Sequence, residues 1–73
     1  MNTVENVPVS HAEIIERNGG STQFATGIAE PVNNVKAWKR NDSIPAAYWL
    51  AVVDAGFAGY KELAEAAQRR LAA

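Results

Sequence analysis

A chain of 73 residues has room for one domain, and an apolar share of 48% is enough for a packed core and argues against disorder. The absence of cysteine excludes a disulfide scaffold and a thiolate metal site. The net charge of −1 hides an uneven distribution, because residues 31–40 contain only basic charged side chains. A focused basic window of this kind is typical of a surface that attracts a polyanion.

The sequence predicts neither export nor membrane insertion. The longest apolar stretch, residues 44–53, is too short to span a bilayer. Residues 1–8 have no basic residue and no apolar segment, so they predict no secretory signal, and we expect a cytoplasmic protein. We expect residues 1–8 to form a flexible arm in front of one folded domain at residues 9–73.

The first helix begins with a capping box. The Ser10 hydroxyl is placed to accept a hydrogen bond from the Glu13 amide, and the Glu13 carboxylate can reach back to the Ser10 amide. The helix should carry Ile14 and Ile15 inward. It should end at Gly19–Gly20, where a left-handed backbone costs least.

A second, short helix is predicted over residues 21–28, with Ser21 as its N-terminal cap. Its apolar face consists of Phe24, Ala25 and Ile28. Gly27 lowers the intrinsic stability of this helix by up to ~1 kcal/mol relative to alanine, so packing must hold the helix in place. A turn is expected at Ala29–Glu30.

The third helix is predicted over residues 31–40. Pro31 suits its first position, where the missing amide proton is not needed. With about 100° per residue, Val32 and Trp38 fall within about 60° of Val35. These three residues therefore define the inward face of the helix.

The outward side of this third helix carries polar and basic side chains. Lysine and arginine can donate to guanine, and asparagine can pair with adenine, in the major groove of DNA. A small residue in the middle of such a face lets the helix lie close to the bases. The residues expected to contact bases are Asn33, Asn34, Lys36, Ala37 and Arg40. Lys39 lies too near the inward face to reach a base, and we expect it to contact phosphate.

A fourth helix, from Pro45 to a stop at Gly56, is apolar nearly all round. Its inward face is predicted to carry Tyr48, Trp49, Val52 and Val53. A helix of this kind is either deeply buried or has part of its surface in contact with a partner. We expect a homodimer interface on its opposite side, together with part of the next helix, and its residues would be Leu50, Ala47 and Ala51.

A fifth helix over residues 60–71 is amphipathic. Its predicted apolar stripe consists of Tyr60, Leu63, Ala64, Ala67 and Leu71. Glu65 and Arg69 have the spacing of an ion pair on the outer face. Five helices and no credible strand predict an all-α domain.

The middle of the chain resembles the small Cro-like and lambda-repressor-like helix-turn-helix proteins of phages and prophages. The residues that carry the resemblance are Ser21-Thr22-Gln23-Phe24-Ala25, Ile28-Ala29, Val35 and Trp38, followed by Ile44-Pro45 and Tyr48-Trp49. The resemblance covers about Ile14 to Ala55. The family usually has glycine at the position of Ala29 and a branched apolar residue at that of Glu30.

This resemblance implies a five-helix lambda-repressor-like domain in which the second and third helices form a helix-turn-helix. It also implies sequence-specific binding of double-stranded DNA, as a homodimer on an inverted-repeat operator, in bacterial or phage gene control. By the same resemblance, Ser21, Thr22 and Gln23 match positions that contact phosphate, and residues 31–40 form the recognition helix.

Several other kinds of site are disfavoured. We expect no enzyme, because no base accompanies the serines and the carboxylates are not paired in a cleft. We expect no cofactor, metal or small-molecule ligand. His11, the only histidine, is expected in solvent, and without cysteine it makes no zinc site. Trp38 and Trp49 fall on inward faces, which favours core packing over stacking on single strands.

The function that this pattern favours is transcription regulation, most simply by a Cro-type repressor. Two alternatives use the same scaffold. A protein-interaction module would suit the net acidity, Glu30 and Asp42. An accessory factor for DNA packaging or recombination would use the same motif.

Overall fold

A computed structural model describes residues 9–72, and within this range the chain forms five α-helices, one 3-10 turn and no strand. The elements are α1 (His11–Arg17), α2 (Gly20–Gly27), α3 (Val32–Asn41), the 3-10 turn η2 (Ala46–Tyr48), α4 (Trp49–Asp54) and α5 (Tyr60–Ala72). The prediction of an all-helical domain with five helices is confirmed. The predicted arm at residues 1–8 and residue 73 lie outside the described residues.

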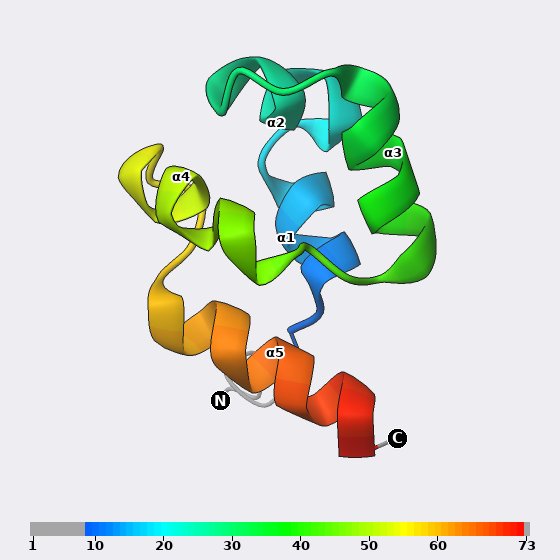
Figure 1. Cartoon of the computed structure of the whole chain (residues 1–73), viewed down its shortest axis with the longest axis vertical. Coiled ribbons are helices and arrows are strands. Elements are labelled where there is room, and N and C mark those ends of the chain that lie inside the picture. Colours follow the sequence, from blue (N-terminus) through cyan, green and yellow to red (C-terminus); the bar gives the residue numbers. More distant parts are fainter. Residues whose placement is uncertain (1–8, 73) are drawn as a thin grey trace, which may run out of the picture.

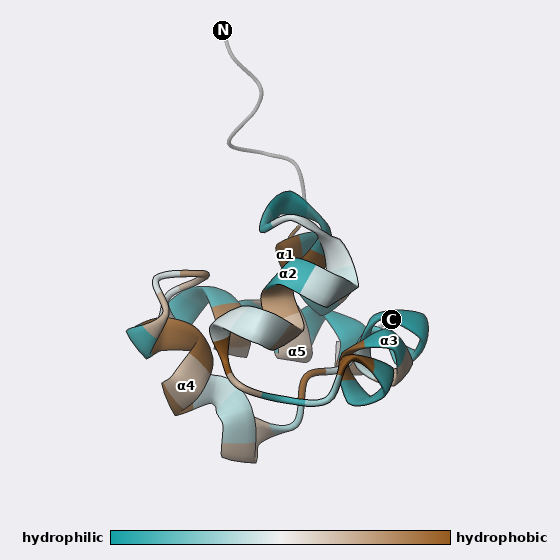
Figure 2. Ribbon diagram, turned by 90° about the horizontal axis from the view of Figure 1, so that it is seen from above, coloured by the Kyte–Doolittle hydropathy of each residue, from teal (hydrophilic) through white to brown (hydrophobic). Residues whose placement is uncertain are grey.

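The helices are arranged around α1, which packs against α2, α3 and α5. In Figure 1, α2 and α3 form the upper part of the molecule and α5 runs along the bottom. α3 and α4 lie on opposite sides of α1, as both Figure 1 and the view from above in Figure 2 show. The two helices therefore present separate surfaces.

The core draws on every α-helix. Its buried members are Ile14, Ile15, Phe24, Ala25, Val35, Trp38, Ile44, Val52 and Leu63. This set confirms the predicted inward face of α1, and the predicted Ile28 and Val32 complete the faces of α2 and α3 as half-buried residues packed against the core. Phe57, which the sequence left without a role, stacks on Phe24 with ring centroids 4.8 Å apart.

The start of α1 is capped from two sides. Ser10 Oγ accepts from the Glu13 amide at 3.1 Å, which confirms this half of the predicted capping box, and the return bond from the Ser10 amide to the Glu13 carboxylate is not formed. Asp42 Oδ1 accepts from the Ala12 amide at 2.9 Å, although it lies 30 residues away in the sequence. Asp42 is also the residue at which α3 ends, in a left-handed backbone with φ of 55°. One residue thus terminates α3 and caps α1.

The expectation that His11 lies in solvent is wrong. Its side chain is buried beneath α5 and beside the segment that follows α3. Nδ1 accepts from the Ile44 amide at 2.8 Å and Nε2 donates to the Leu63 carbonyl at 2.9 Å. Burial is favourable because both ring nitrogens are satisfied, one by the amide of a loop residue that no helix pairs and the other by a carbonyl of α5. The ring also packs edge-on against Trp49, with centroids 5.9 Å apart.

Two predicted helix starts shift by one residue. Ser21 is not the cap of α2, because the helix begins at Gly20 with Gly19 as its cap. Gly19 and Gly20 have φ values of 98° and 85°, and these left-handed conformations reverse the chain early enough for α2 to start before Ser21. Pro31 is the extended cap of α3 and not its first helical residue.

The predicted apolar stripe of α5 is only partly correct. Leu63 and Ala66 are buried and Ala67 is half-buried, whereas Tyr60, Ala64 and Leu71 are exposed. Within residues 9–72, α5 packs against α1 and α4 and meets α3 through the Arg70 side chain. The rest of the molecule therefore covers a narrower face of α5 than the apolar stripe predicts. The predicted Glu65–Arg69 pair is also wrong, because Glu65 lies 3.9 Å from Lys61 Nζ and Arg69 donates to the Glu65 backbone carbonyl.

Candidate nucleic-acid interface

The rotational setting of α3 is as the sequence predicts. Val35 is fully buried, Trp38 is 8% exposed and Val32 is half-buried against the core. On the opposite side, the exposed residues are Asn33, Asn34, Lys36 and Arg40, and Ala37 is half-buried. The structure therefore brings the residues expected to contact bases to one outer surface.

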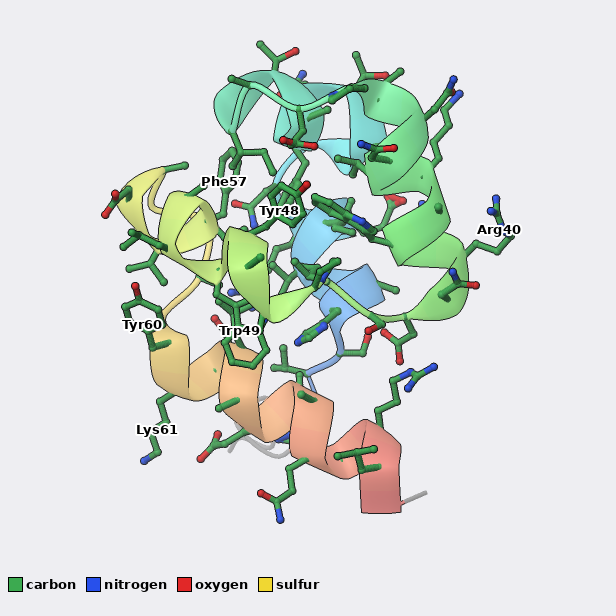
Figure 3. The ribbon with its side chains drawn as sticks, in the orientation of Figure 1. Arg40, Tyr48, Trp49, Phe57, Tyr60 and Lys61 are labelled. Carbon is green, nitrogen blue, oxygen red and sulfur yellow. The ribbon has the colours of Figure 1, made fainter. Side chains whose placement is uncertain are left out.

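Two basic side chains of this surface have no carboxylate partner among residues 9–72. Lys36 and Arg40 are both exposed, and neither forms a salt bridge with a described residue. Figure 3 shows Arg40 projecting from the C-terminal part of α3 away from the body of the molecule. Both charges are therefore accessible to a polyanion.

Two other polar residues of α3 have partners within the chain. Asn34 Nδ2 donates to Glu30 Oε1 at 3.3 Å, across the N-terminal end of the helix. Lys39, which was expected to contact phosphate, forms an ion pair with Glu16 of α1. Its side chain is 39% exposed, so it lies at the edge of the α3 surface with its charge already offset.

The residues expected to contact phosphate from α2 lie in its first turn. Thr22 and Gln23 are exposed and Ser21 is half-buried. α2 packs against α3. The connection between the two helices contains Ala29, whose φ of 57° is the left-handed conformation that usually favours glycine.

The residues expected at a dimer interface lie elsewhere. Leu50 is 59% exposed, Ala47 is exposed and Ala51 is half-buried, all on η2 and α4. Figure 2 shows apolar residues along α4 and hydrophilic residues along α3, on opposite sides of the molecule. A partner bound to α4 would leave the outer surface of α3 free.

One basic residue beside α3 is not predicted by the sequence pattern. Arg70 Nε donates to the Asn41 carbonyl oxygen at 3.2 Å, at the C-terminal end of α3. In Figure 1 the C-terminal end of α5 lies below this end of α3, and in the view from above in Figure 2 the two ends overlap. The sequence shows only two arginines in the last turn of a helix, and nothing local to them indicates that α3 is nearby.

Other kinds of site have little support in the described part of the chain. Residues 9–72 contain no cluster of histidine and carboxylate side chains that could hold a metal ion. An open depression on α5 is lined by Glu65, Gln68 and Arg69, whose carboxylate, amide and guanidinium are all solvent-facing. No helix within the described residues combines the length and the apolar character needed to cross a bilayer.

Comparison with known proteins found no matching family model, no matching curated protein and no matching solved structure.

Proposed function

We propose that the chain binds double-stranded DNA sequence-specifically, with α2 and α3 as the helix-turn-helix of a lambda-repressor-like domain. The observation that carries this proposal is the polarity of α3. Val35 and Trp38 are buried, and the opposite face presents amide and basic side chains with no acidic residue in the helix. A helix of this character fits the major groove.

Each outward residue has a role in this proposal. Arg40 and Lys36 donate to guanine O6 and N7, and Asn33 and Asn34 pair with adenine. Ala37 lets the helix approach the bases and contacts a thymine methyl group. The first turn of α2 binds the phosphate backbone through Ser21, Thr22 and Gln23. Lys39 contacts phosphate by exchanging its Glu16 partner for the DNA.

The biological role that follows is a dimeric regulator of transcription, most simply a Cro-type repressor acting in the cytoplasm of a bacterial or phage-infected cell. The second copy docks on η2 and α4 around Leu50. The position of α4 on the other side of α1 from α3 is compatible with this arrangement, because a second copy docked on α4 does not cover the outer surface of α3. Symmetric dimers of this kind read inverted repeats.

Selection of bound sites from a random pool of duplexes tests the proposal directly, because it reports binding, half-site spacing and symmetry together. With the selected site, Asn33→Ala and Arg40→Ala should each lose about 1–3 kcal/mol of discrimination against random DNA. Lys39→Ala should weaken specific and random binding about equally. Lys61→Ala removes a charge on the far side from α3 and is the matched control (Figure 3).

Two results would contradict the proposal. One is the enrichment of no sequence from the pool, with no mobility shift at micromolar protein in low salt. The other is a loss of discrimination in Lys61→Ala as large as that in Arg40→Ala.

A protein-interaction module is the second candidate, and one observation favours it. Leu50 exposes an apolar side chain on a helix that is already rich in apolar residues. An apolar surface of this kind is suited to another protein and not to DNA. If the chain binds no duplex, this surface is the next one to test.

A further inference from the structure

The Arg70 side chain is hydrogen-bonded to the end of the proposed recognition helix. Its Nε donates to the backbone carbonyl of Asn41, the last residue of α3, at 3.2 Å. Arg40 is the neighbouring residue in the chain and projects outward from the same end of α3 (Figure 3). α5 therefore adds a second guanidinium to the C-terminal end of α3.

The surroundings of Arg70 leave its charge available. Asp42 is the nearest acidic residue along the chain to Asn41, and its carboxylate is directed to the Ala12 amide at the start of α1. Among residues 9–72, neither Arg40 nor Arg70 forms a salt bridge. The Asn41 carbonyl takes only the Nε–H of Arg70, so the terminal N–H groups of the guanidinium are not used by this hydrogen bond.

We propose that Arg70 contacts a backbone phosphate of the DNA that α3 reads, next to the bases contacted by Arg40. This inference rests on the proposed function. A guanidinium binds phosphate through two parallel N–H groups, and the bond to Asn41 holds the side chain in place before DNA arrives. A side chain that is ordered in advance loses less conformational entropy on binding. The contact adds affinity without sequence preference.

Arg69 provides the matched control, because it has the same charge in the same turn of α5 but a different environment. Its Nη1 lies 3.5 Å from the Glu65 carbonyl of its own helix, and it borders the depression formed with Glu65 and Gln68. No hydrogen bond links Arg69 to α3 within the described residues. Loss of Arg69 removes an equal charge from a position away from α3.

The test measures the affinity of the full chain for its selected duplex at several salt concentrations. Each phosphate contact contributes about 0.9 to the slope of log affinity against log salt, which is about eightfold in affinity at 0.1 M salt. Arg70→Ala should reduce the slope by about 0.9 per protomer. It should weaken binding to random DNA by the same factor as binding to the selected duplex. Arg69→Ala should leave the slope unchanged.

Arg70→Lys separates the phosphate contact from a purely structural bond to Asn41. Lysine keeps the charge but loses the guanidinium edge, so the slope should be retained even if thermal stability falls. Equal slopes for Arg70→Ala, Arg69→Ala and the parent chain would overturn this inference and leave the proposed function intact. Failure of the parent chain to bind any duplex would overturn both.

Discussion

Ala29 adopts a backbone conformation that costs an alanine free energy. Its φ of 57° is in the left-handed region, where Cβ lies too close to the following carbonyl. The conformation is maintained by the hydrogen bond from the Glu30 amide to the Ala25 carbonyl at 3.0 Å, which closes the end of α2. The turn between α2 and α3 therefore has an alanine at a position whose backbone conformation favours glycine.

Replacing this residue should stabilise the protein. Ala29→Gly removes the Cβ, and we expect the free energy of unfolding to rise by about 1 kcal/mol. This value includes the opposing effect of glycine, which makes the unfolded chain more flexible. For a chain of this size, that gain corresponds to a rise in Tm of about 4–8 °C.

Thermal unfolding followed by circular dichroism measures this effect. Ala64→Gly is the control, since Ala64 is exposed on α5 with a helical backbone and should lose about 1 kcal/mol. A fall in Tm for both variants would mean that Ala29 is not strained.

His11 and Lys39 show what a residue's own neighbours in the sequence do not reveal. His11 is buried because Leu63 and Ile44, both more than 30 residues away, supply its hydrogen-bond partners. Lys39 is paired because α1 brings Glu16 alongside α3. Neither partner can be identified from sequence spacing, which is informative within one helix only.

At the scale of elements, α2 depends on the segment that follows α4. The Phe57 ring lies against Gly27, and a Cβ added to Gly27 would overlap that ring. Phe57 also stacks on Phe24 of α2, with an angle of 26° between the rings. The glycine that weakens α2 as an isolated helix therefore leaves the space that the Phe57 ring occupies.

Gly27→Ala should therefore destabilise the protein, although alanine is the better helix former. Overpacking of this kind costs typically 1–3 kcal/mol. Chemical denaturation should show a lower midpoint for Gly27→Ala than for the parent chain.

Two further variants check the cause of this loss. Gly59→Ala is the matched control, because a Cβ there meets nothing within 4 Å. In a double-mutant cycle, Gly27→Ala should lower the free energy of unfolding by less when residue 57 is leucine than when it is phenylalanine. The difference between the two losses is the coupling energy of Gly27 and Phe57. If the losses of stability from the two substitutions simply add in the double variant, Gly27 and Phe57 do not interact.

For the whole molecule, one ion pair links the first helix to the last. Arg17 Nη2 lies 2.5 Å from Glu62 Oε1, joining α1 to α5. The hydrogen bond from Arg17 lowers the pKa of Glu62 below its usual value, and the same bond raises the pKa of Arg17. Asn18 Nδ2 and Arg17 Nη2 both donate to the Phe57 carbonyl, so the pair is part of a wider set of bonds between these segments.

This pair predicts a dependence of stability on pH. Because the folded pKa of Glu62 is lowered, its contribution is present above the unfolded value of about 4.5 and is lost as the pH falls through the folded value. Glu62→Gln should lower the free energy of unfolding at pH 7 by less than about 1 kcal/mol, because the pair is partly exposed.

The difference between Glu62→Gln and the parent chain should shrink towards zero as the pH falls below about 4.5. Urea denaturation at a series of pH values measures it. Glu65→Gln is the control, because its Lys61 partner is 3.9 Å away and highly exposed. A difference that is unchanged at pH 3 would contradict the role of the Glu62 charge.

The sequence by itself determined what depends on contacts within one helix. Periodicity identified five helices and the inward side of α3, and the Ser10 cap was correct, because side chains three and four residues apart meet on the same helix. Tertiary structure alone decided which helices meet. It buried His11, paired Lys39 with Glu16, narrowed the covered face of α5 and brought Arg70 to the end of α3. These contacts join residues far apart in the chain, and their partners are set by how whole helices pack around α1.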